Sequence, residues 1–413
     1  MTKARILADY VAGGTTATEF DYMDGVTSNV QTQLTALDTA KAPLASPTFT
    51  GTTTVSGDLV PSTPLTNRNM IINGAMQVSQ RGNVTIPHSG TGVYTSKDRF
   101  SIYNGSSAAY TTKASETAYP IEEFPQCLQL DVTTSDTGLT AGDRSEIVYK
   151  AEGQDLQAWN KGKATAKPVT LSFWIRTSVT GTYILECYDA DSTRHICKSY
   201  TVSSANTWEK KVITIDADTT GVWDNDNSES LSIRWWLIAG STYNSGTLQT
   251  TWASAVSANR AVGQVNAVSS TSNFIYLTGV QLELGSNATP FEHRSYGDEL
   301  ARCQRYYEQL VDGYDSGLGV GLEYNSGTGL YVPVYFTTAK RVDTWAVKES
   351  GTNYYMRSRR NNNVGCVVTG FQARNKGGGV LTITASSDAG VDGGACWVEA
   401  AESDANVAID AEL

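Results

Sequence analysis

Residue types that carry out acid–base, nucleophilic or metal chemistry are sparse in this chain. It has three histidines, and none belongs to an H-E-x-x-H metal-binding motif. The sequence also lacks a G-x-S-x-G nucleophile elbow, a P-loop and a G-x-G-x-x-G dinucleotide fingerprint. Its 42 acidic residues offer many carboxylate pairs, and glycoside hydrolysis needs only that two of them lie close in space. The sequence therefore favours a binding protein that uses no cofactor and is not an enzyme, with a glycoside hydrolase as the enzymatic alternative.

A run of oxygen-bearing side chains between Trp223 and Glu229 is the one candidate metal loop. Asp224 and Asp226 stand at alternate positions, as the first ligands of a calcium loop do. An EF-hand is excluded, because its sixth position is Glu229 where a glycine is needed and its twelfth is Trp235 where a glutamate is needed. The two remaining interpretations are an irregular calcium site at Asp224 and Asp226 and a solvated turn.

Aromatic side chains are the more promising binding groups, since the chain has 9 Trp and 21 Tyr. Planar rings stack on the C–H faces of sugars while their polar tips stay hydrated. Trp223, Tyr243 and Trp252 stand in polar, loop-like contexts and are candidate glycan contacts, with internal packing as the alternative. Four other tryptophans are expected to pack in the core or between sheets: Trp174, Trp208, Trp235 and Trp236.

A second candidate recognition segment gathers arginines and aromatic residues beside Asn361–Asn363, where a hairpin tip is expected. Both residue types are favoured at recognition hot spots. The alternative is that these arginines only offset neighbouring acids on an exposed strand. The glycan candidates of this segment are Trp345, Tyr354, Tyr355, Arg357, Arg359 and Arg360.

The elements that must position these side chains are mainly short β-strands. Apolar residues alternate with polar ones in 169–177, 230–240 and 273–285, and clusters of Gly, Asn, Asp and Ser separate the runs. Residues 67–295 are therefore predicted to form an antiparallel sandwich of jelly-roll type. The predicted inward residues are Val169, Leu171, Phe173, Ile175, Leu231, Ile233, Trp235, Leu237, Val280, Leu282 and Leu284.

A linking helix is predicted over 296–312, between two β regions. Ser295 can cap it with Asp298 three residues on, and Gly313 is expected to end it. Strand patterns resume afterwards, so 313–413 is predicted to be a β-rich C-terminal tip domain. The apolar residues at helical spacing are Leu300, Cys303, Tyr307 and Leu310.

Six scattered cysteines are too few for a disulfide framework, and a reducing site of synthesis fits them. Cys187 and Cys197 lie symmetrically about Ser192, in a hairpin expected to turn at 189–194. They could face each other across the strands. A disulfide and a pair of reduced packing residues are both open.

Residues 1–66 are predicted to hold an attachment segment, a coiled-coil stem and an extended neck. A heptad frame fits 23–44, where one seam position is apolar throughout and the other is mixed. Three heptads are marginal without partner strands, so a single surface helix is the alternative. The apolar seam residues are Met23, Val30, Leu34, Leu37 and Leu44.

Charge and hydropathy restrict the partners. The chain carries 31 basic and 42 acidic residues, and its net charge of -11 argues against nucleic acid and anionic membranes as partners. No apolar run approaches the roughly 18 residues of a membrane span, and the first ten residues lack the apolar core of a secretory signal. We therefore expect a soluble, unprocessed protein that does not insert into membranes.

Two stretches of sequence resemble bacteriophage tail-fibre proteins. The segment EFDYMDGVTSNVQTQLTALDTAKAPLASPTFTGT is similar to their N-terminal stem, through Glu19, 24–27, 31–34 and 41–51. The segments NRNMIINGAMQVSQRG, YTSKDRF, LSFWIRT and GVQLELGSNATPFEHRSYGDELARCQRYYE resemble phage fibre domains that are similar to jelly-roll carbohydrate-binding modules. Together they span most of residues 19–310.

The resemblance implies a homotrimeric virion fibre that is synthesised in the host cytoplasm. Residues 1–20 would attach to the phage tail or an adaptor protein, and the distal β domains would bind host surface polysaccharide or lipopolysaccharide. The chain differs from the family pattern in having one short stem and no shaft repeats. A tail-associated polysaccharide depolymerase and a purely structural tail adaptor are the alternatives.

Overall fold

The computed structural model describes Thr32, Leu34, Thr35, 66–114, 121, 123–314, 316–324, 328–349, 355–359, 362–386, 393–403 and 405–413. The chain divides into two compact units, Met1–Ser62 and Thr63–Leu413, so the predicted sandwich and tip domain lie in one unit. In the first unit, Leu34 is helical and 51% exposed. The other seam residues, Met23, Val30, Leu37 and Leu44, lie outside the described residues, so the coiled coil stays a prediction.

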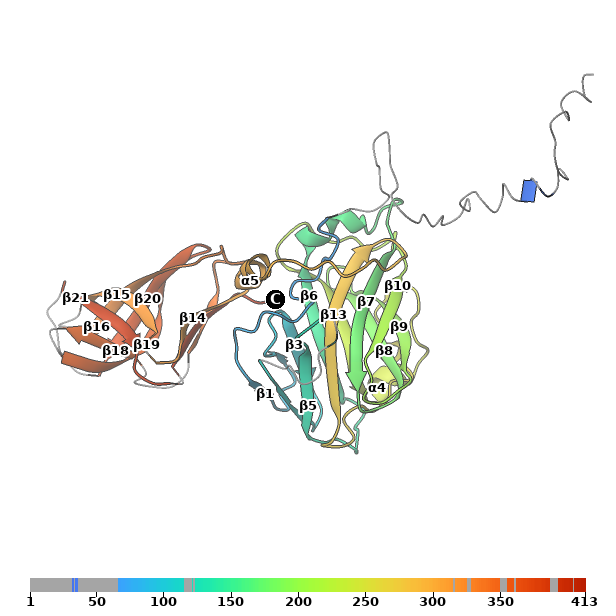
Figure 1. The fold of residues 1–413 in the computed structure, drawn as a ribbon, viewed down its shortest axis with the longest axis horizontal. Helices are drawn as coiled ribbons and strands as arrows, with labels where there is room; N and C mark the ends of the chain where they lie inside the picture. The colour runs from blue at the N-terminus through green and yellow to red at the C-terminus, as the bar shows by residue number, and fades with distance from the viewer. Residues whose placement is uncertain are drawn as a thin grey trace, which may run out of the picture. The chain divides into compact units, whose positions relative to one another are not determined.

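Two antiparallel sheets form the sandwich (Figure 1). The six-stranded sheet has the order β1 (Val84–Ile86), β4 (Ala109–Thr112), β5 (Leu128–Thr134), β13 (Phe274–Leu284), β7 (Val169–Thr177) and β10 (Glu209–Ile215). The seven-stranded sheet has the order β12 (Ala253–Ser254), β9 (Arg194–Val202), β8 (Gly181–Asp189), β11 (Glu229–Ala239), β6 (Arg144–Glu152), β3 (Phe100–Asn104) and β2 (Gly92–Tyr94). The connections include η1 (Gly153–Trp159), α4 (Ser241–Asn244) and η2 (Ser257–Asn259).

The core lies between the two sheets and follows the predicted alternation. Residues of both sheets share one hydrophobic cluster, which contains the predicted inward residues, with Leu284 at its edge. Trp235 of β11 crosses the interface, since its ring lies 5.8 Å from that of Phe173 in β7. Each fully buried large apolar side chain contributes roughly 1.5–3 kcal/mol. The predicted antiparallel sandwich is therefore confirmed.

A bulge in β13 changes which residues of this strand face the core. Ile275 and Leu277 point inward before it, whereas Val280 and Leu282 do so after it, and the pairing with β7 shifts between Thr278 and Gln281. Gly279 stands in the bulge with φ of +60°. Only glycine adopts this backbone conformation without steric strain.

The linking helix is shorter than predicted. Ser295 caps α5 (Tyr296–Gln304) and accepts a hydrogen bond from Asp298 N at 3.2 Å, but residues Tyr307–Asp312 form strand β14. The prediction of a helix up to 312 was wrong, because β14 pairs with β22 (Asn406–Asp410). A partner about a hundred residues away is invisible to local periodicity.

The described residues after Tyr306 are mainly β-structure, as predicted. Strands β14, β22 and β17 (Ala346–Glu349) form a three-stranded sheet. A closed barrel has the order β15 (Gly317–Tyr324), β16 (Gly329–Tyr335), β20 (Gly378–Ala385), β19 (Asn362–Asn375), β18 (Tyr355–Arg359) and β21 (Ala395–Ala400). No helix among the described residues is long and apolar enough to cross a membrane.

Cys187 and Cys197 do not face each other. The predicted hairpin forms, but its register pairs Glu186 with Cys197 and Cys187 with Ile196. Adjacent positions in a strand point to opposite faces, so Cys187 packs in the core and Cys197 packs on the outward side. All six cysteines are buried, and none of them forms a disulfide.

Candidate functional site

The outward face of the six-stranded sheet carries rings and polar side chains together. Since the odd residues of β7 point into the core, Trp174 and Arg176 point outward. The register places Tyr276 beside Arg176 and Phe274 beside Asp131. The guanidinium carbon of Arg176 lies 4.8 Å from the centroid of Phe274, which is within cation–π range. We call this surface the aromatic face, defined by Phe124, Gln129, Asp131, Trp174, Arg176, Phe274 and Tyr276.

The bulge at Gly279 lets two rings lie directly on the sheet. A Cβ atom at this position would meet the ring of Phe124 at 2.8 Å and that of Trp174 at 2.9 Å. Phe124 is buried under Phe291 and His293, whose ring centroids lie 4.9 and 5.5 Å from its own, whereas Trp174 is half-buried. A cavity of about 170 Å³ is lined by Ile121, Glu123, Phe124 and Trp174. Pockets for drug-sized ligands measure roughly 300–1,000 Å³, so this cavity has room for one ring of a longer chain.

Polar groups of the aromatic face hold one another in place. Gln129 donates from Nε2 to Asp131 Oδ2 at 2.6 Å and to the Tyr276 hydroxyl at 3.0 Å. That hydroxyl lies 3.3 Å from Asp131 Oδ1, to which it donates. Lys113 Nζ lies 3.5 Å from the same carboxylate at the solvent side. Gln129 and Tyr276 are buried, so they fix the half-buried Asp131. The half-buried Trp174 indole can take the C–H face of a sugar, and Asp131 and Arg176 on the same face can bind its hydroxyls.

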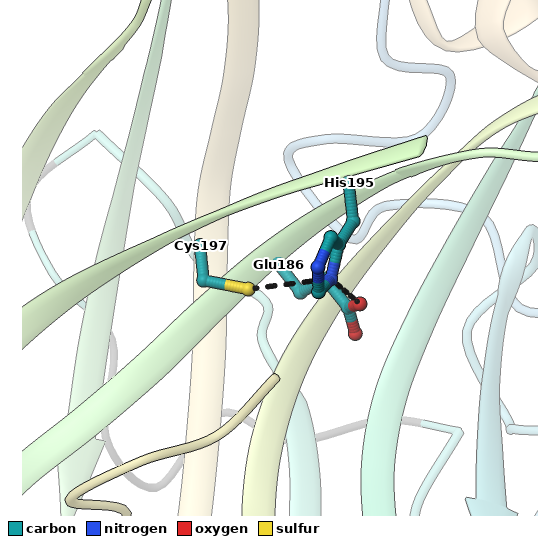
Figure 2. Close-up of side chains that lie close together, drawn as sticks. All are labelled: Glu186, His195 and Cys197. Atoms are coloured by element: carbon teal, nitrogen blue, oxygen red, sulfur yellow. Dashed lines mark hydrogen bonds and ion pairs between the residues drawn. The ribbon is translucent and has the colours of Figure 1, made fainter. Parts of the chain in front are cut away.

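The outward face of the seven-stranded sheet is built differently, because residues 240–261 cover part of it. We call the charged cluster beneath this cover the buried ion network, defined by Glu186, His195, Cys197, Trp236 and Arg260. Figure 2 shows Glu186 of β8 and His195 and Cys197 of β9 pointing toward one another. Their ligand atoms lie within 4.8 Å of one another, and zinc accepts this donor set.

In the buried ion network, hydrogen bonds occupy the acceptor positions of the Glu186 carboxylate, so none is left for a metal. Arg260 donates to Glu186 from Nε at 2.8 Å and from Nη2 at 2.9 Å, and Trp236 Nε1 donates at 3.2 Å. Val256 N donates to His195 Nε2, so the ring proton is on Nδ1 and is donated to Glu186 at 3.0 Å. These four donors use the roughly four acceptor positions of one carboxylate.

The charges of this network are matched without a metal. Burial alone would raise the pKa of Glu186, but the charge of Arg260 and the hydrogen bond from His195 outweigh it and lower the pKa to about 2. Burial raises the pKa of the Cys197 thiol, whereas zinc binds thiolate. We therefore interpret the cluster as a structural ion pair that fastens the cover to the sheet.

Trp223 and Trp252, two of the sequence-predicted glycan contacts, lie around Lys161. Trp223 is 5% exposed and meets Trp159 edge-on at 4.6 Å, so its ring offers no face to a sugar and that prediction is corrected. Lys161 Nζ lies 5.2 Å from the Trp223 ring centroid and 4.8 Å from that of Trp252. Trp252 is half-buried and donates from Nε1 to Asp216 O at 2.8 Å.

Tyr243, the third sandwich candidate, lies in α4 within the cover. Its half-buried ring lies 5.5 Å from that of Trp236, and the guanidinium carbons of Arg144 and Arg260 are 5.3 and 5.7 Å from its centroid. Trp223 and Trp252 instead lie around Lys161, which is not among the neighbours of Tyr243. The predicted aromatic residues therefore do not combine into one site.

In the C-terminal candidate segment, Trp345 is buried. It is 1% exposed, packs between the rings of Phe336 and Phe371 at 5.2 and 4.3 Å, and donates from Nε1 to Asn375 O at 3.0 Å. This corrects its prediction as a glycan contact. Of the other candidates, Tyr355, Arg357 and Arg359 lie on β18, of which the structure describes the backbone, and Tyr354 and Arg360 lie outside the described residues.

The weak calcium candidates Asp224 and Asp226 lie in an exposed turn. Both Asp226 carboxylate oxygens accept hydrogen bonds from Ser228, from its backbone N at 2.8 Å and its hydroxyl at 3.0 Å. Asp224 N donates to Asp191 Oδ2 at 3.0 Å. These hydrogen bonds are typical of a turn that is stabilised by its own side chains. They favour the solvated turn over the irregular calcium site.

Sequence reasoning assigned Trp174 to internal packing and did not select it as a site residue. The signal was present, because strict alternation in 169–177 puts Trp174 and Arg176 on the face opposite to the core residues. Phe124 and Gln129 gave no such signal, because their place on this face depends on pairing with β13.

Some solved structures are similar to parts of the chain. One is the enzymatically active domain of tailspike protein 4 of bacteriophage CBA120, with 14% identity over 52% of this chain and 21% of that chain and a TM-score of 0.25. Another is the family 11 carbohydrate-binding module of a Clostridium thermocellum cellulase, with 16% identity over 52% and 98% and a TM-score of 0.24. A tandem carbohydrate-binding module from Paenibacillus barcinonensis gives 10% over 83% and 96% with a TM-score of 0.25.

The chain thus spans about a fifth of the tailspike domain. At these identities and TM-scores the likenesses do not identify a function for this chain. No family model matches the chain, and no curated protein is significantly similar to it.

Proposed function

We propose that this chain is a non-enzymatic tail fibre of a bacteriophage virion that binds a host surface glycan through the aromatic face of its sandwich. The observation that carries the glycan part is the half-buried Trp174 beside a cavity of about 170 Å³, on the same sheet face as the half-buried Asp131 and Arg176. The resemblance of residues 19–310 to phage fibre sequences supports the virion part.

The aromatic face is suited to hold an extended saccharide because its side chains stand on paired strands. Trp174 and Arg176 are fixed on β7, and Tyr276 and Phe274 are fixed on β13, which pairs with β7 over most of its length. Polar groups that are positioned before the ligand arrives lose little freedom on binding. The ligand is therefore expected to lie across β13 and β7, with one ring on the indole.

The fibre is expected to act as a homotrimer that attaches to the tail or an adaptor protein through its first residues. A single shallow site binds weakly, whereas linking three sites raises the apparent affinity by about 10²–10⁴-fold when all can engage. Light scattering of the full chain should give a mass about three times 44.4 kDa. A monomer mass for folded protein would contradict the trimeric fibre.

Binding to lipopolysaccharide and capsular polysaccharide from a susceptible bacterium tests the proposed ligand. The full-length chain should bind one of them, and Trp174→Ala should weaken binding at least tenfold. Tyr335→Ala is the matched control, because this ring is 84% exposed and lies in β16 of the barrel. Equal binding by wild type and Trp174→Ala would exclude the aromatic face as the site.

The same incubation separates binding from the two alternatives. A depolymerase would release new reducing ends from the polysaccharide, and the proposed fibre should release none. A purely structural tail adaptor would bind neither polysaccharide, although it would still be found in purified particles.

A further inference from the structure

A second pocket lies where the sandwich meets the three-stranded sheet. It has a volume of about 390 Å³, which is within the roughly 300–1,000 Å³ typical of ligand pockets, and such pockets often lie between structural layers or domains. The sandwich contributes residues around β1 and β2, and each strand of the three-stranded sheet contributes one: Tyr307, Lys348 and Asp410. We call it the junction pocket.

The floor of the junction pocket is fixed by Arg81. Its side chain is 9% exposed, and its guanidinium contacts Asp98 Oδ1 at 3.3 Å and Glu412 Oε1 at 2.9 Å. The guanidinium carbon also lies 3.7 Å from the ring centroid of Tyr307 and 5.0 Å from that of Tyr94. Two carboxylates therefore offset the charge of Arg81, and two rings hold it in place.

The last residues of the chain hold the two sides of this pocket together. Glu412 contacts Arg81 and also Arg99, which is fully buried. The Leu413 carbonyl accepts hydrogen bonds from the Tyr94 hydroxyl at 3.0 Å and from Lys150 Nζ at 2.9 Å. Figure 1 marks the end of the chain beside α5 and β6. The pocket is thus a built feature of this fold and not a gap between loose parts.

The mouth of the pocket presents groups that can bind polar atoms. Lys348 Nζ lies 4.0 Å from Asp410 Oδ2, and the lysine side chain is 61% exposed. An ion pair with one exposed partner contributes little to stability, so Lys348 can turn to a ligand. Asp410 is held by a hydrogen bond from Glu412 N to its Oδ1 at 3.1 Å, and its Oδ2 faces Lys348. Half-buried Val84 and Val93 add apolar wall.

The charges decide which ligand class suits these walls. The charges around the pocket balance, because Asp98 and Glu412 are paired with Arg81 and Arg99 and Lys348 lies beside Asp410, so the walls carry no surplus charge for an ionic ligand. A purely apolar ligand would remove water from Lys348 and Asp410 without replacing its hydrogen bonds. A neutral saccharide satisfies both requirements, since its hydroxyls can bind the charged pair while its C–H faces lie against the rings and valines.

We propose that the junction pocket is a second binding site for one or two neutral sugar residues of the host glycan. This inference rests on the proposed function and adds to it a second saccharide site that is separate from the aromatic face. Each chain then has two separate saccharide sites, one on the six-stranded sheet and one between the sandwich and the three-stranded sheet.

The test uses Gly92, which lines the pocket and has open space around it. A Cβ atom there would meet only Ser101 Oγ, at 3.9 Å, so Gly92→Trp should fill the pocket without a backbone clash, and Gly92→Ala is the matched control. Oligosaccharides released from host polysaccharide, separated by anion exchange into neutral and acidic fractions, serve as probes in calorimetric titrations of the full chain.

The neutral fraction should give two sites per chain for wild type and Gly92→Ala, one site for Gly92→Trp, one for Trp174→Ala, and none for the double variant. One site in wild type that Trp174→Ala abolishes would overturn the junction pocket while the proposed function stands. If the acidic fraction, and not the neutral one, binds at a site that Gly92→Trp removes, the neutral ligand class would be overturned. Absence of all binding by correctly folded trimer would overturn both proposals.

Discussion

The aromatic face and the buried ion network lie on the outward surfaces of the two sheets and use the same kinds of side chain. Each combines tryptophan, arginine and a carboxylate. In the buried ion network Trp236 is fully buried and Glu186 accepts four hydrogen bonds, so every group is used within the protein. On the aromatic face, Trp174 and Asp131 are half-buried and still reach solvent. The two outward faces differ because residues 240–261 cover one of them, and not because their residue types differ.

The comparison teaches that a surface cluster is a binding candidate only when its polar groups still have capacity for a ligand. A buried charge with full pairing contributes to the fold, because the loss of one partner leaves the other desolvated. A half-exposed group keeps part of its hydration, and a ligand can replace that water.

The largest effect is expected from removing Arg260. Arg260→Ala leaves Glu186 buried without its cation, so the free energy of unfolding should fall by about 3–5 kcal/mol. Arg176→Ala on the aromatic face is the matched control and should change it by about 1 kcal/mol or less. Denaturant unfolding measures both. Equal losses in the two variants would show that the two faces do not differ as described.

The pH dependence of stability should also separate the two faces. The pKa of Glu186 is lowered to about 2 from 4.5, so its contribution is complete above pH 4.5 and is lost as the pH falls toward 2. At about 1.4 kcal/mol per unit, this is about 3 kcal/mol. The difference in unfolding free energy between wild type and Glu186→Gln should shrink by that amount from pH 6 to pH 2. A constant difference would mean that Glu186 is not held ionised by Arg260.

Saccharide affinity should depend on the aromatic face and not on the buried ion network, which is the reverse of the expectation for stability. Trp174→Ala is expected to reduce saccharide affinity about 30-fold, which corresponds to about 2 kcal/mol, the usual size of a hot-spot effect. Arg260→Ala, if measured well below its unfolding midpoint, should leave affinity unchanged. Titration with host polysaccharide distinguishes them, and a larger loss for Arg260→Ala would move the site to the seven-stranded sheet.

The smallest effect is expected at Gly279. Gly279→Ala puts a Cβ atom at φ of +60° and against the rings of Phe124 and Trp174. The backbone conformation alone costs about 1–2 kcal/mol in stability. Displacement of the indole should also lower saccharide affinity. Thr85→Ala, at an exposed position of β1, provides a control in the same sheet, and unchanged unfolding and binding for Gly279→Ala would contradict the role of the bulge.

Local patterns were enough to predict the strands but not their partners. Alternation in 169–177 and 230–240 identifies the inward residues, because period-two burial is a property of each strand alone. The Ser295 cap was also readable, since it needs only residues three apart. The residues after Gln304 were misassigned because β14 forms only against β22.

The site residues were harder to predict, because exposure depends on what covers a strand. Trp223 and Trp345 stand in polar stretches of sequence, yet Trp159 covers the first and two phenylalanines cover the second. Trp174 stands in an apolar stretch, yet its ring reaches the outward cavity. The register of a hairpin is equally non-local, which is why the sequence left open whether Cys187 and Cys197 face each other.

Hydroxyl-radical footprinting of the full chain with and without host polysaccharide tests most directly where the glycan binds. Our account predicts that Trp174 and Phe274 lose most of their oxidation when the polysaccharide is present, while Tyr335 keeps its own. Unchanged oxidation of Trp174 in saturated protein, with protection at another surface, would contradict it.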